Sequence, residues 1–286
     1  KGVVRERPDG TINPNMPTGH VEVLAHELQV LNRSETPPFH HDEQANEELR
    51  LKYRYLDLRR EDMLGNLRLR HSVTRAMREY LENDSYMEVE TPMMHPIPGG
   101  ANAKPFITHH NALDVERYLR IAPELYLKRL IVGGMEAVFE INRNFRNEGM
   151  DRTHNPEFTI MELYVAYKDY YWMMDTTEQL LEKVAIDANG STKVTMGEKE
   201  IDFKAPYPRI PILEAIKKHT GYEVAGMDEK SLRDVAIKLG IEADESMGVG
   251  KLIDEIFGEK CEHHYIQPTF IIDYPKEMSP LTKEHR

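Results

Sequence analysis

Apolar and polar residues alternate along residues 20–25, after a segment rich in proline, glycine and asparagine. An alternation with a period of two, bounded by turn residues, is typical of β-strands. We therefore predict a pair of strands within residues 3–36. Because a lone hairpin is rarely stable, we expect these strands to complete a larger sheet or to lean on another domain. Residues 36–39 are a candidate linker.

From Asn46 onwards the hydrophobic pattern becomes helical. Apolar residues recur at steps of three and four within residues 69–80, which predicts one apolar face on a long helix. Residues 83–85 should end this helix, and the alternation in residues 86–90 predicts a short strand that stops before Pro92. The residues of the apolar face are Leu69, Val73, Ala76, Met77 and Tyr80.

The central part of the chain predicts a helix followed by two strands. The helix begins near Glu124, and the first strand covers residues 138–141. A polar loop over residues 147–156 leads to a second strand over residues 157–167. The two strands are antiparallel if the loop is a simple return. Alternate residues of the second strand lie on one face, namely Phe158, Ile160, Glu162 and Tyr164.

After the second strand we predict helices and short strands without a regular βαβ order. This arrangement favours an α+β domain in which helices flank an antiparallel sheet. The predicted elements are helices at 172–188, 211–219, 228–239 and 249–264, a hairpin at 191–204, and a strand at 267–274.

The composition limits the class of protein. The chain has 286 residues, 40% of them hydrophobic, enough for one large domain or two ordinary ones. No apolar run approaches the ~20 residues that cross a bilayer, so we expect no membrane partner. The single cysteine, Cys261, excludes an intramolecular disulfide and a multi-thiolate metal site. Such low cysteine use mildly favours a cytoplasmic location.

The formal net charge of −12 argues against a protein that coats nucleic acid. It leaves room for a local basic patch that docks a nucleic acid. A solvated helix face is the alternative interpretation of the same basic residues, with partners such as Asp57, Glu61 and Glu79. The basic residues are Arg50, Lys52, Arg54, Arg59, Arg60, Arg68, Arg70, Arg75 and Arg78.

Residues 145–158 contain the strongest chemical signal. The chain has neither a Walker-type phosphate loop nor a GxGxxG run, so a nucleotide site must be built from side chains and irregular backbone. Arginine suits phosphate because its donor fork is planar, and an aromatic ring can stack on a base. A surface hairpin with assorted polar residues is the alternative. The residues concerned are Arg146, Arg152, His154 and Phe158.

Carboxylates form the expected floor of the same pocket. Glu162 and Tyr164 share a strand face with Phe158, and Glu124 starts a neighbouring helix. Buried carboxylates need a positive partner or a proton, and a cationic ligand would supply a positive partner. Alternatively, they form structural ion pairs with nearby bases, namely Arg120, Lys128 and Arg129.

Two further features carry weaker signals. Gly99 and Gly100 permit close backbone approach to a ligand, although a plain turn is the simpler explanation. Adjacent histidines could suggest a metal, but their side chains diverge and no third ligand follows at metal spacing. We therefore expect no metal site in this chain. The histidine pairs are His40–His41, His109–His110 and His263–His264.

At this point the sequence resembles a known family. The strings FRNEG and RTHNPEFT, within residues 145–159, resemble motif 2 of the class II aminoacyl-tRNA synthetases. The longer stretch that begins PGGANAKPFITHHNALD, from residue 98 onwards, resembles the lysyl-tRNA synthetases in particular. The helix, strand and proline that end at Pro92 resemble motif 1, which builds the dimer interface in this class. The resemblance covers about residues 70–286 and implies activation of lysine with ATP and its transfer to tRNA(Lys).

The resemblance implies roles only where residues match. Arg146 would bind the α-phosphate of ATP and the lysine carboxylate, and it would stabilise charge during the reaction. Glu148 and Asn155 would hold the adenosine. His154 would face the outer phosphates, and Phe158 would stack on adenine.

The amino acid would occupy the other half of the site. Gly100 and Glu124 would hold the α-amino group of lysine, and Glu162 and Tyr164 would line the pocket for its ε-ammonium. Two alternatives stay open. The first is an aspartate-activating synthetase, because residues 1 to about 70 look more like bacterial-type aspartyl-tRNA synthetase. The second is a non-catalytic module for dimerisation or binding.

The resemblance also predicts how the chain is organised. We expect the Mg²⁺ ligands and a second phosphate-binding arginine in motif 3, a segment that does not appear before Arg286. A symmetric homodimer through motif 1 is expected. The expected parts are the end of an anticodon-binding OB-like domain (1–36), a linker (37–63) and the catalytic domain (64–286), with motif 1 at about 66–92, motif 2 at about 137–167 and a helical insertion at about 205–265.

Overall fold

The computed structural model describes residues 1–40, 45–279 and 282. The chain divides into two compact units, Lys1–Gly65 and Asn66–Arg286. Within the described residues, no helix has both the length and the apolar character that crossing a membrane requires.

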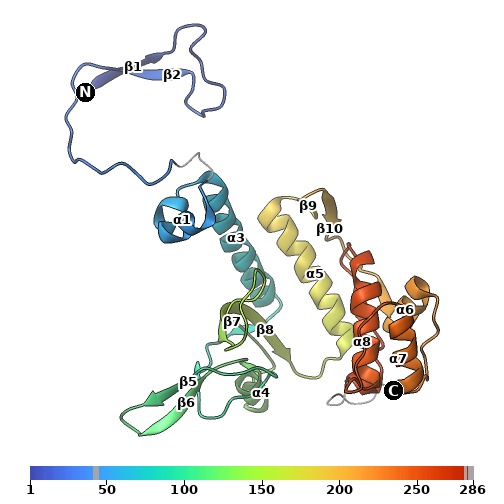
Figure 1. Ribbon diagram of the computed structural model, residues 1–286. Helices are drawn as coiled ribbons and strands as arrows, with labels where there is room; N and C mark the ends of the chain where they lie inside the picture. The colour runs from blue at the N-terminus through green and yellow to red at the C-terminus, as the bar shows by residue number, and fades with distance from the viewer. Residues whose placement is uncertain (41–44, 280–281, 283–286) are drawn as a thin grey trace. The chain divides into compact units, whose positions relative to one another are not determined.

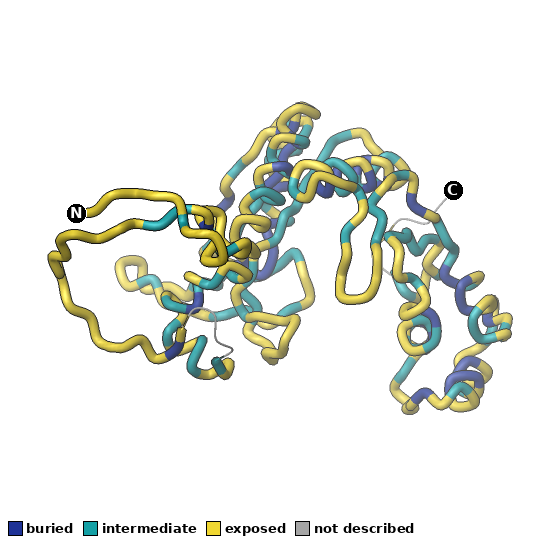
Figure 2. The backbone as a smooth tube through the Cα atoms, turned by 90° about the horizontal axis from the view of Figure 1, so that it is seen from above, coloured by how far each residue is buried: buried dark blue, intermediate teal, exposed yellow. Residues whose placement is uncertain are grey.

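The first unit begins with the predicted strand pair. β1 (Gly2–Glu6) and β2 (Val21–Ala25) form an antiparallel hairpin in which Val4 pairs with Val23. Figure 2 shows both strands mostly in the exposed colour, and the side chains of Val4 and Val23 are each 65% exposed. The alternation therefore predicts the strands correctly, and within this unit the hairpin buries almost no apolar surface.

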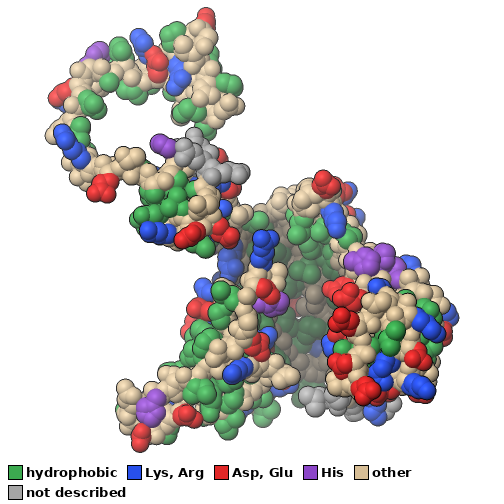
Figure 3. All heavy atoms as spheres, in the orientation of Figure 1, with side chains coloured by type: hydrophobic (Ala, Val, Ile, Leu, Met, Phe, Trp, Pro, Cys, Tyr) green, Lys and Arg blue, Asp and Glu red, His purple; other side chains and the backbone are tan. Residues whose placement is uncertain are grey.

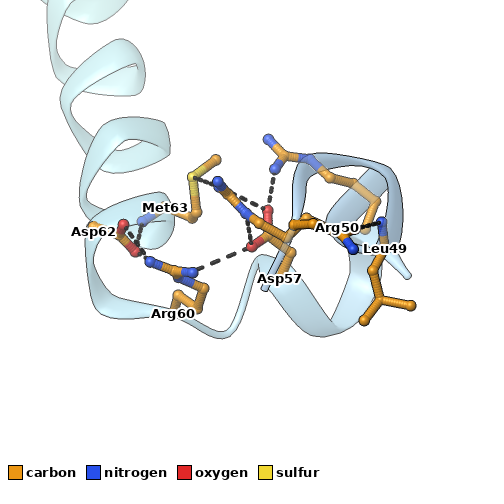
Figure 4. Close-up of polar contacts among 8 residues, drawn as sticks. Leu49, Arg50, Asp57, Arg60, Asp62 and Met63 are labelled. Carbon is orange, nitrogen blue, oxygen red and sulfur yellow. Dashed lines mark hydrogen bonds and ion pairs between the residues drawn. The ribbon is translucent and has the colours of Figure 1, made fainter. Parts of the chain in front are cut away.

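A buried carboxylate organises the helical part of the first unit. α1 (Glu47–Lys52) and α2 (Arg54–Asp57) bring Asp57, which is fully buried, against three arginines (Figure 4). Arg50 donates from Nε to Asp57 at 2.8 Å, Arg54 donates to the second oxygen, and Arg60 lies 3.9 Å away. The hydrogen bond from Arg50 is the main cause that lowers the pKa of Asp57. Three arginines of the basic stretch are thus paired with an acid of this chain. This outcome was expected if the basic residues have acidic partners within the protein rather than docking a nucleic acid.

Two long helices form one layer of the second unit. α3 (Glu61–Asn83) ends where predicted, and α5 (Tyr170–Asn189) is capped by the Asp169 side chain, which accepts from the Trp172 backbone N–H. Ala76 on α3 packs with Leu180 and Val184 on α5. Most of the predicted apolar face lies in this contact, but Leu69 is 47% exposed.

The central sheet has the order β3-β7-β8 (Figure 1). β7 (Ala137–Phe145) and β8 (Glu157–Val165) are antiparallel, as predicted, and β3 (Met87–Glu88) runs parallel to β7. Because side chains alternate along a strand, the sheet has two chemically different faces. Phe139 and Leu163 pack on one face, with Leu81 of α3. The other face carries Glu140 and Asn144 from β7 opposite Glu162 and Phe158 from β8.

The remaining elements confirm an α+β domain but add pairings that the hydrophobic pattern did not reveal. The missed strands are short or exposed, so they carry little alternation: β4 (Met94–His95), β5 (Ile107–His110), β6 (Val115–Leu119) and β11 (Arg209–Pro211). β11 pairs in parallel with β12 (Phe270–Ile272), so the sheets are not purely antiparallel. α4 (Glu124–Val132), β9 (Lys193–Met196) and β10 (Lys199–Asp202) lie where predicted.

Three helices near the C-terminus share a core of their own. α6 (Ile212–Thr220), α7 (Glu229–Lys238) and α8 (Val249–Lys260) match the predicted helices, although the last one ends earlier and continues as the short η1 (Glu262–His264). Another short 3-10 helix, η2 (Lys276–Met278), follows β12. The core of this helical module is lined by Ile212, Ile216, Leu232, Leu252, Ile256 and Cys261, all at most 1% exposed.

The packing of α3 against the sheet predicts a large loss of stability on truncation at its centre. Leu81 is fully buried beside Tyr86 and Phe139, so Leu81→Ala should lower the free energy of unfolding by about 2–5 kcal/mol, measured by urea denaturation. Leu69→Ala is the matched control on the same helix, and its cost should be about 1 kcal/mol or less. Equal losses in the two variants would contradict this account of the core.

Candidate active site

The polar face of the β7–β8 pair carries three of the predicted site residues, and the others lie on the adjoining loop and at or beside the start of α4. Residues directly opposite each other on antiparallel strands point to the same side of the sheet. Glu140 lies opposite Glu162, and Asn144 lies opposite Phe158. Tyr164 follows on the same face of β8, and its hydroxyl donates to Glu162 at 3.0 Å. The structure therefore brings Phe158, Glu162 and Tyr164 together as the alternation predicted.

Arg146 stands where β7 runs into the loop. Its backbone N–H donates to the Pro156 carbonyl at 2.9 Å, which ties the two ends of the loop together. Its guanidinium carbon lies 5.2 Å from the centre of the Phe158 ring, a cation–π arrangement. Nε of Arg146 is buried and has no hydrogen-bond partner among the described residues. A buried donor of this kind is costly unless it is satisfied, so the site favours an anionic ligand near Arg146.

The loop between the strands is held by its own polar groups. Asp151 accepts from the backbone N–H of Thr153 at 2.7 Å, the main cause that lowers the pKa of Asp151, and it also pairs with Nδ1 of His154. The His154 side chain is 75% exposed. Glu148 accepts from the backbone N–H of Lys104 at 3.3 Å, and Asn155 is exposed. Glu148, His154 and Asn155 thus lie on the rim of the site, where a large ligand can reach them.

Gly100 lies against the start of α4. Its φ is +91°, a conformation that favours glycine, and a Cβ there would come within 3.1 Å of Glu124 Cβ and 3.2 Å of Ala122 Cβ. A side chain at residue 100 would therefore collide with the element that carries Glu124. The predicted proximity of Gly100 and Glu124 is thus present in the structure.

The three carboxylates of the site have different partners. Glu124 pairs with Lys128 at 2.6 Å, and the buried Glu140 pairs with Arg120 at 2.7 Å. Glu162 has the Tyr164 hydroxyl, and the ion pairs of the described residues give it no cation. Burial is the main cause that raises the pKa of Glu162, and the negative charge of Glu124 adds to it. Glu162 is therefore the carboxylate that gains most from a cationic ligand.

Of the two acids predicted for the pocket, Glu124 and Glu162, only Glu124 forms an ion pair among the described residues. Its partner Lys128 is one of the bases named in the alternative interpretation. Arg129 instead stacks on the Tyr126 ring at 4.9 Å. Sequence reasoning missed Glu140 and did not place Arg120 within the site. A charged residue in the apolar run around Glu140 was the available signal, since a buried acid needs a partner.

Described histidines of the predicted pairs contact aromatic rings or an acid. Figure 3 shows histidine side chains gathered on the α6–α8 module, where the ring of His264 stacks on His219 at 4.3 Å and lies 4.0 Å from His263. His109 pairs with Asp114 at 3.2 Å. His41 lies outside the described residues. In the part of the chain that the structure describes, no group of three or more histidine, cysteine or acidic side chains could hold a metal ion.

Comparison with known proteins agrees with this geometry. The family described as tRNA synthetases class II (D, K and N) matches residues 46–286. The chain belongs to this family. Glu140, Arg146, Phe158 and Glu162 all lie inside the matched range. The expected resemblance to the class II aminoacyl-tRNA synthetases is thereby confirmed.

Curated relatives are named lysine–tRNA ligase. One from Porphyromonas gingivalis is 62% identical over 243 residues, which cover 85% of this chain and 42% of the relative. One from Christiangramia forsetii is 58% identical and covers 86% and 43%, respectively. One from Azobacteroides pseudotrichonymphae is 52% identical over 94% of this chain and 56% of its own length, so the similarity reaches well into residues 1–70. The chain thus spans roughly half the length of these relatives, or less.

The raised pKa of Glu162 makes stability depend on pH. Between its ordinary and its folded pKa, the folded chain holds a proton that the unfolded chain has released, so stability falls as the pH rises through this window. Glu162→Gln should remove this fall and raise the melting temperature over the wild type at about pH 7 more than at about pH 4. Circular dichroism at the two pH values checks this.

Glu157→Gln is the control for this comparison. Glu157 opens the same strand but is exposed, so its substitution should leave the pH dependence of the melting temperature as in the wild type. If Glu162→Gln raises the melting temperature equally at both pH values, burial does not penalise the charge of this carboxylate.

Proposed function

We propose that this chain belongs to an enzyme that activates lysine with ATP and transfers it to tRNA(Lys). Glu162 carries the proposal, because it is a half-buried carboxylate without a cation on the same strand face as Phe158, beside Arg146. A pocket with an anionic floor and a cationic, aromatic mouth suits an amino acid with a positive side chain and a nucleoside triphosphate. The names of the relatives support the same substrate.

Arg146 and its neighbours would form the ATP half of the site. The guanidinium would hold the α-phosphate together with the lysine carboxylate, and Phe158 would stack on adenine beside it. Glu148 and Asn155 would hold the adenosine, and His154 would meet the outer phosphates. A carboxylate oxygen of lysine attacks the α-phosphorus, and the bond to the leaving pyrophosphate breaks. Catalysis then rests on orientation and on the charge of Arg146 rather than on proton transfer.

The acids would form the lysine half. Glu162 and Tyr164 would receive the ε-ammonium, and Gly100 and Glu124 would receive the α-amino group. The substrate amine would displace Lys128 as the partner of Glu124. The loss of that ion pair costs little free energy, because an exposed i,i+4 ion pair is weak.

An aspartate-activating enzyme fits the site less well. The carboxylate of an aspartate side chain would require a free base on the floor of the pocket. Arg120 is buried there and is already bonded to Glu140, while Glu162 would repel the substrate. A non-catalytic module would not explain the buried and unpartnered Nε of Arg146. Lysine activation is therefore the proposal that the side chains support best.

The proposed organisation follows the compact units. The division at Gly65 supports a catalytic domain over residues 64–286, and the separate core of α6–α8 supports an insertion over about 205–265. The hairpin of β1 and β2 would belong to an OB-like domain within residues 1–36, followed by a linker over 37–63. The site is expected to use Mg²⁺ with ATP, but we assign no magnesium ligand within the described residues.

Pyrophosphate exchange into ATP tests the proposed substrate. This chain should support exchange with lysine and not with aspartate, measured in parallel at equal concentrations. Arg146→Ala should lower the rate at least about 100-fold, since it removes the main charge at the reacting phosphate. Arg143→Ala is the matched control on the other face of β7, where Arg143 pairs only with the exposed Glu157, and it should stay near the wild-type rate. Exchange with aspartate alone would overturn the proposal.

The proposed dimer makes a separate prediction. Met87 lies on β3 and is 54% exposed in the isolated chain, which suits a residue covered by a second copy through motif 1. Met87→Glu, or a charge at Val89, should convert a dimer to a monomer in sedimentation analysis, because a buried charge at an interface is costly. Met196→Glu alters an equally exposed methionine on β9 and should leave the mass unchanged.

A further inference from the structure

Arg120 lies along the edge of β7 that β8 does not cover. It is 1% exposed, and its backbone carbonyl accepts from the Phe145 N–H at 2.9 Å. Nε donates to the Arg143 carbonyl at 2.8 Å, and Nη1 donates to Glu140 at 2.7 Å. The backbone and the side chain of Arg120 thus both bond to the end of β7. Bonds from Nε and Nη1 hold the guanidinium, while Nη2 is buried and has no hydrogen-bond partner among the described residues.

Glu140 is the acid that this guanidinium meets. It is 1% exposed, and one carboxylate oxygen accepts from the Thr91 hydroxyl at 2.6 Å. It lies directly opposite Glu162 in the strand register. Two carboxylates in such positions cannot both stay charged without compensation, because like charges directly across a sheet repel. Arg120 supplies the compensation on the side of Glu140.

The charged and titratable groups around Glu162 can be assigned element by element. On β8 itself, the Tyr164 hydroxyl donates to it. On α4, the Glu124 carboxylate is close but has its own partner in Lys128. From the side of β7 come the negative charge of Glu140 and the positive charge of Arg120. The last two form an ion pair with each other, and the ion pairs of the described residues give Glu162 no cation of its own.

We propose that Arg120 is a positioning residue that determines where the negative charge of the pocket lies. By neutralising Glu140, it leaves Glu162 as the single uncompensated carboxylate that receives the substrate ammonium. The inference rests on the proposed function. It deepens that function because it assigns the ε-ammonium to Glu162 rather than to Glu140. Without Arg120, Glu140 and Glu162 would share a proton, and the pocket would lose its fixed charge near neutral pH.

Two variants separate the charge of Arg120 from its packing. Glu140→Gln keeps the shape of the residue, and the Thr91 hydroxyl can turn to accept from the new amide. This variant leaves the charge of Arg120 uncompensated beside Glu162. The double variant Arg120→Met with Glu140→Met removes both charges and replaces a buried ion pair by apolar groups of similar volume, an exchange that buried pairs often tolerate.

The pKa of Glu162, measured by ¹³C carboxyl NMR on the ligand-free chain, is the primary readout. Glu140→Gln should lower this pKa by about 1 or more, because the free charge of Arg120 now favours the carboxylate. The double variant should return it close to the wild-type value. Glu157→Gln serves as the control and should change nothing at Glu162. An unchanged pKa in Glu140→Gln, or the same change in Glu140→Gln and the double variant, would overturn the proposal.

Lysine binding by calorimetry is the second readout. Glu140→Gln should weaken lysine about tenfold, since it adds one positive charge next to the ammonium site, and the double variant should restore the affinity. Norleucine, which keeps the α-ammonium but lacks the ε-ammonium, should bind all variants alike. If the NMR titration behaves as expected but the wild type binds no lysine, the proposed function fails and the charge role of Arg120 stands. If lysine binds but the titration does not respond, the charge role fails alone.

Discussion

The two-faced pairing of β7 with β8 is the constraint on which the rest of the second unit depends. One set of alternate residues, including Phe139 and Leu163, packs with α3 and the start of α5 and anchors the sheet. The other set faces the side of α4 and carries Glu140, Glu162 and Phe158. A shift of the register by one residue would exchange the two faces and bury every site residue in the core. The register that buries the apolar face therefore also places the site residues of these strands on the opposite face.

The sequence predicts this arrangement well where side chains repeat with a strong period. The alternation from Phe158 to Tyr164 identified both the strand and its polar face, and the apolar steps from Val73 to Tyr80 identified α3. The predictions were poorest for short strands such as β4 and β11. These have two or three residues each, too few for a period to appear, and they exist because a distant segment offers them a partner.

The same limit explains which site residues escaped detection. Arg146 lies in a loop of unusual composition, and Glu162 belongs to the alternation of β8, so local pattern is enough to single them out as candidates. Arg120 and Glu140 are 20 residues apart, and their pairing is a matter of tertiary structure. The rule that a buried acid needs a partner applies to Glu140, but it does not say which base forms the ion pair. Ion pairs between residues that are far apart in the chain are thus the part of a site that is hardest to predict from a single sequence.

Charge compensation also reconciles the acidic chain with the anionic substrates that we propose for it. A net charge of −12 would repel ATP and tRNA if the charges were spread evenly. Among the described residues, Arg146 has no ion pair and lies over the Phe158 ring, whereas Glu140 and Glu162 lie on the central part of β7 and β8. The buried Nε of Arg146 has no acceptor among those residues, so a phosphate would gain a hydrogen bond there without displacing one. Local placement of a few charges, rather than their sum, decides which ligand this face of the sheet can bind.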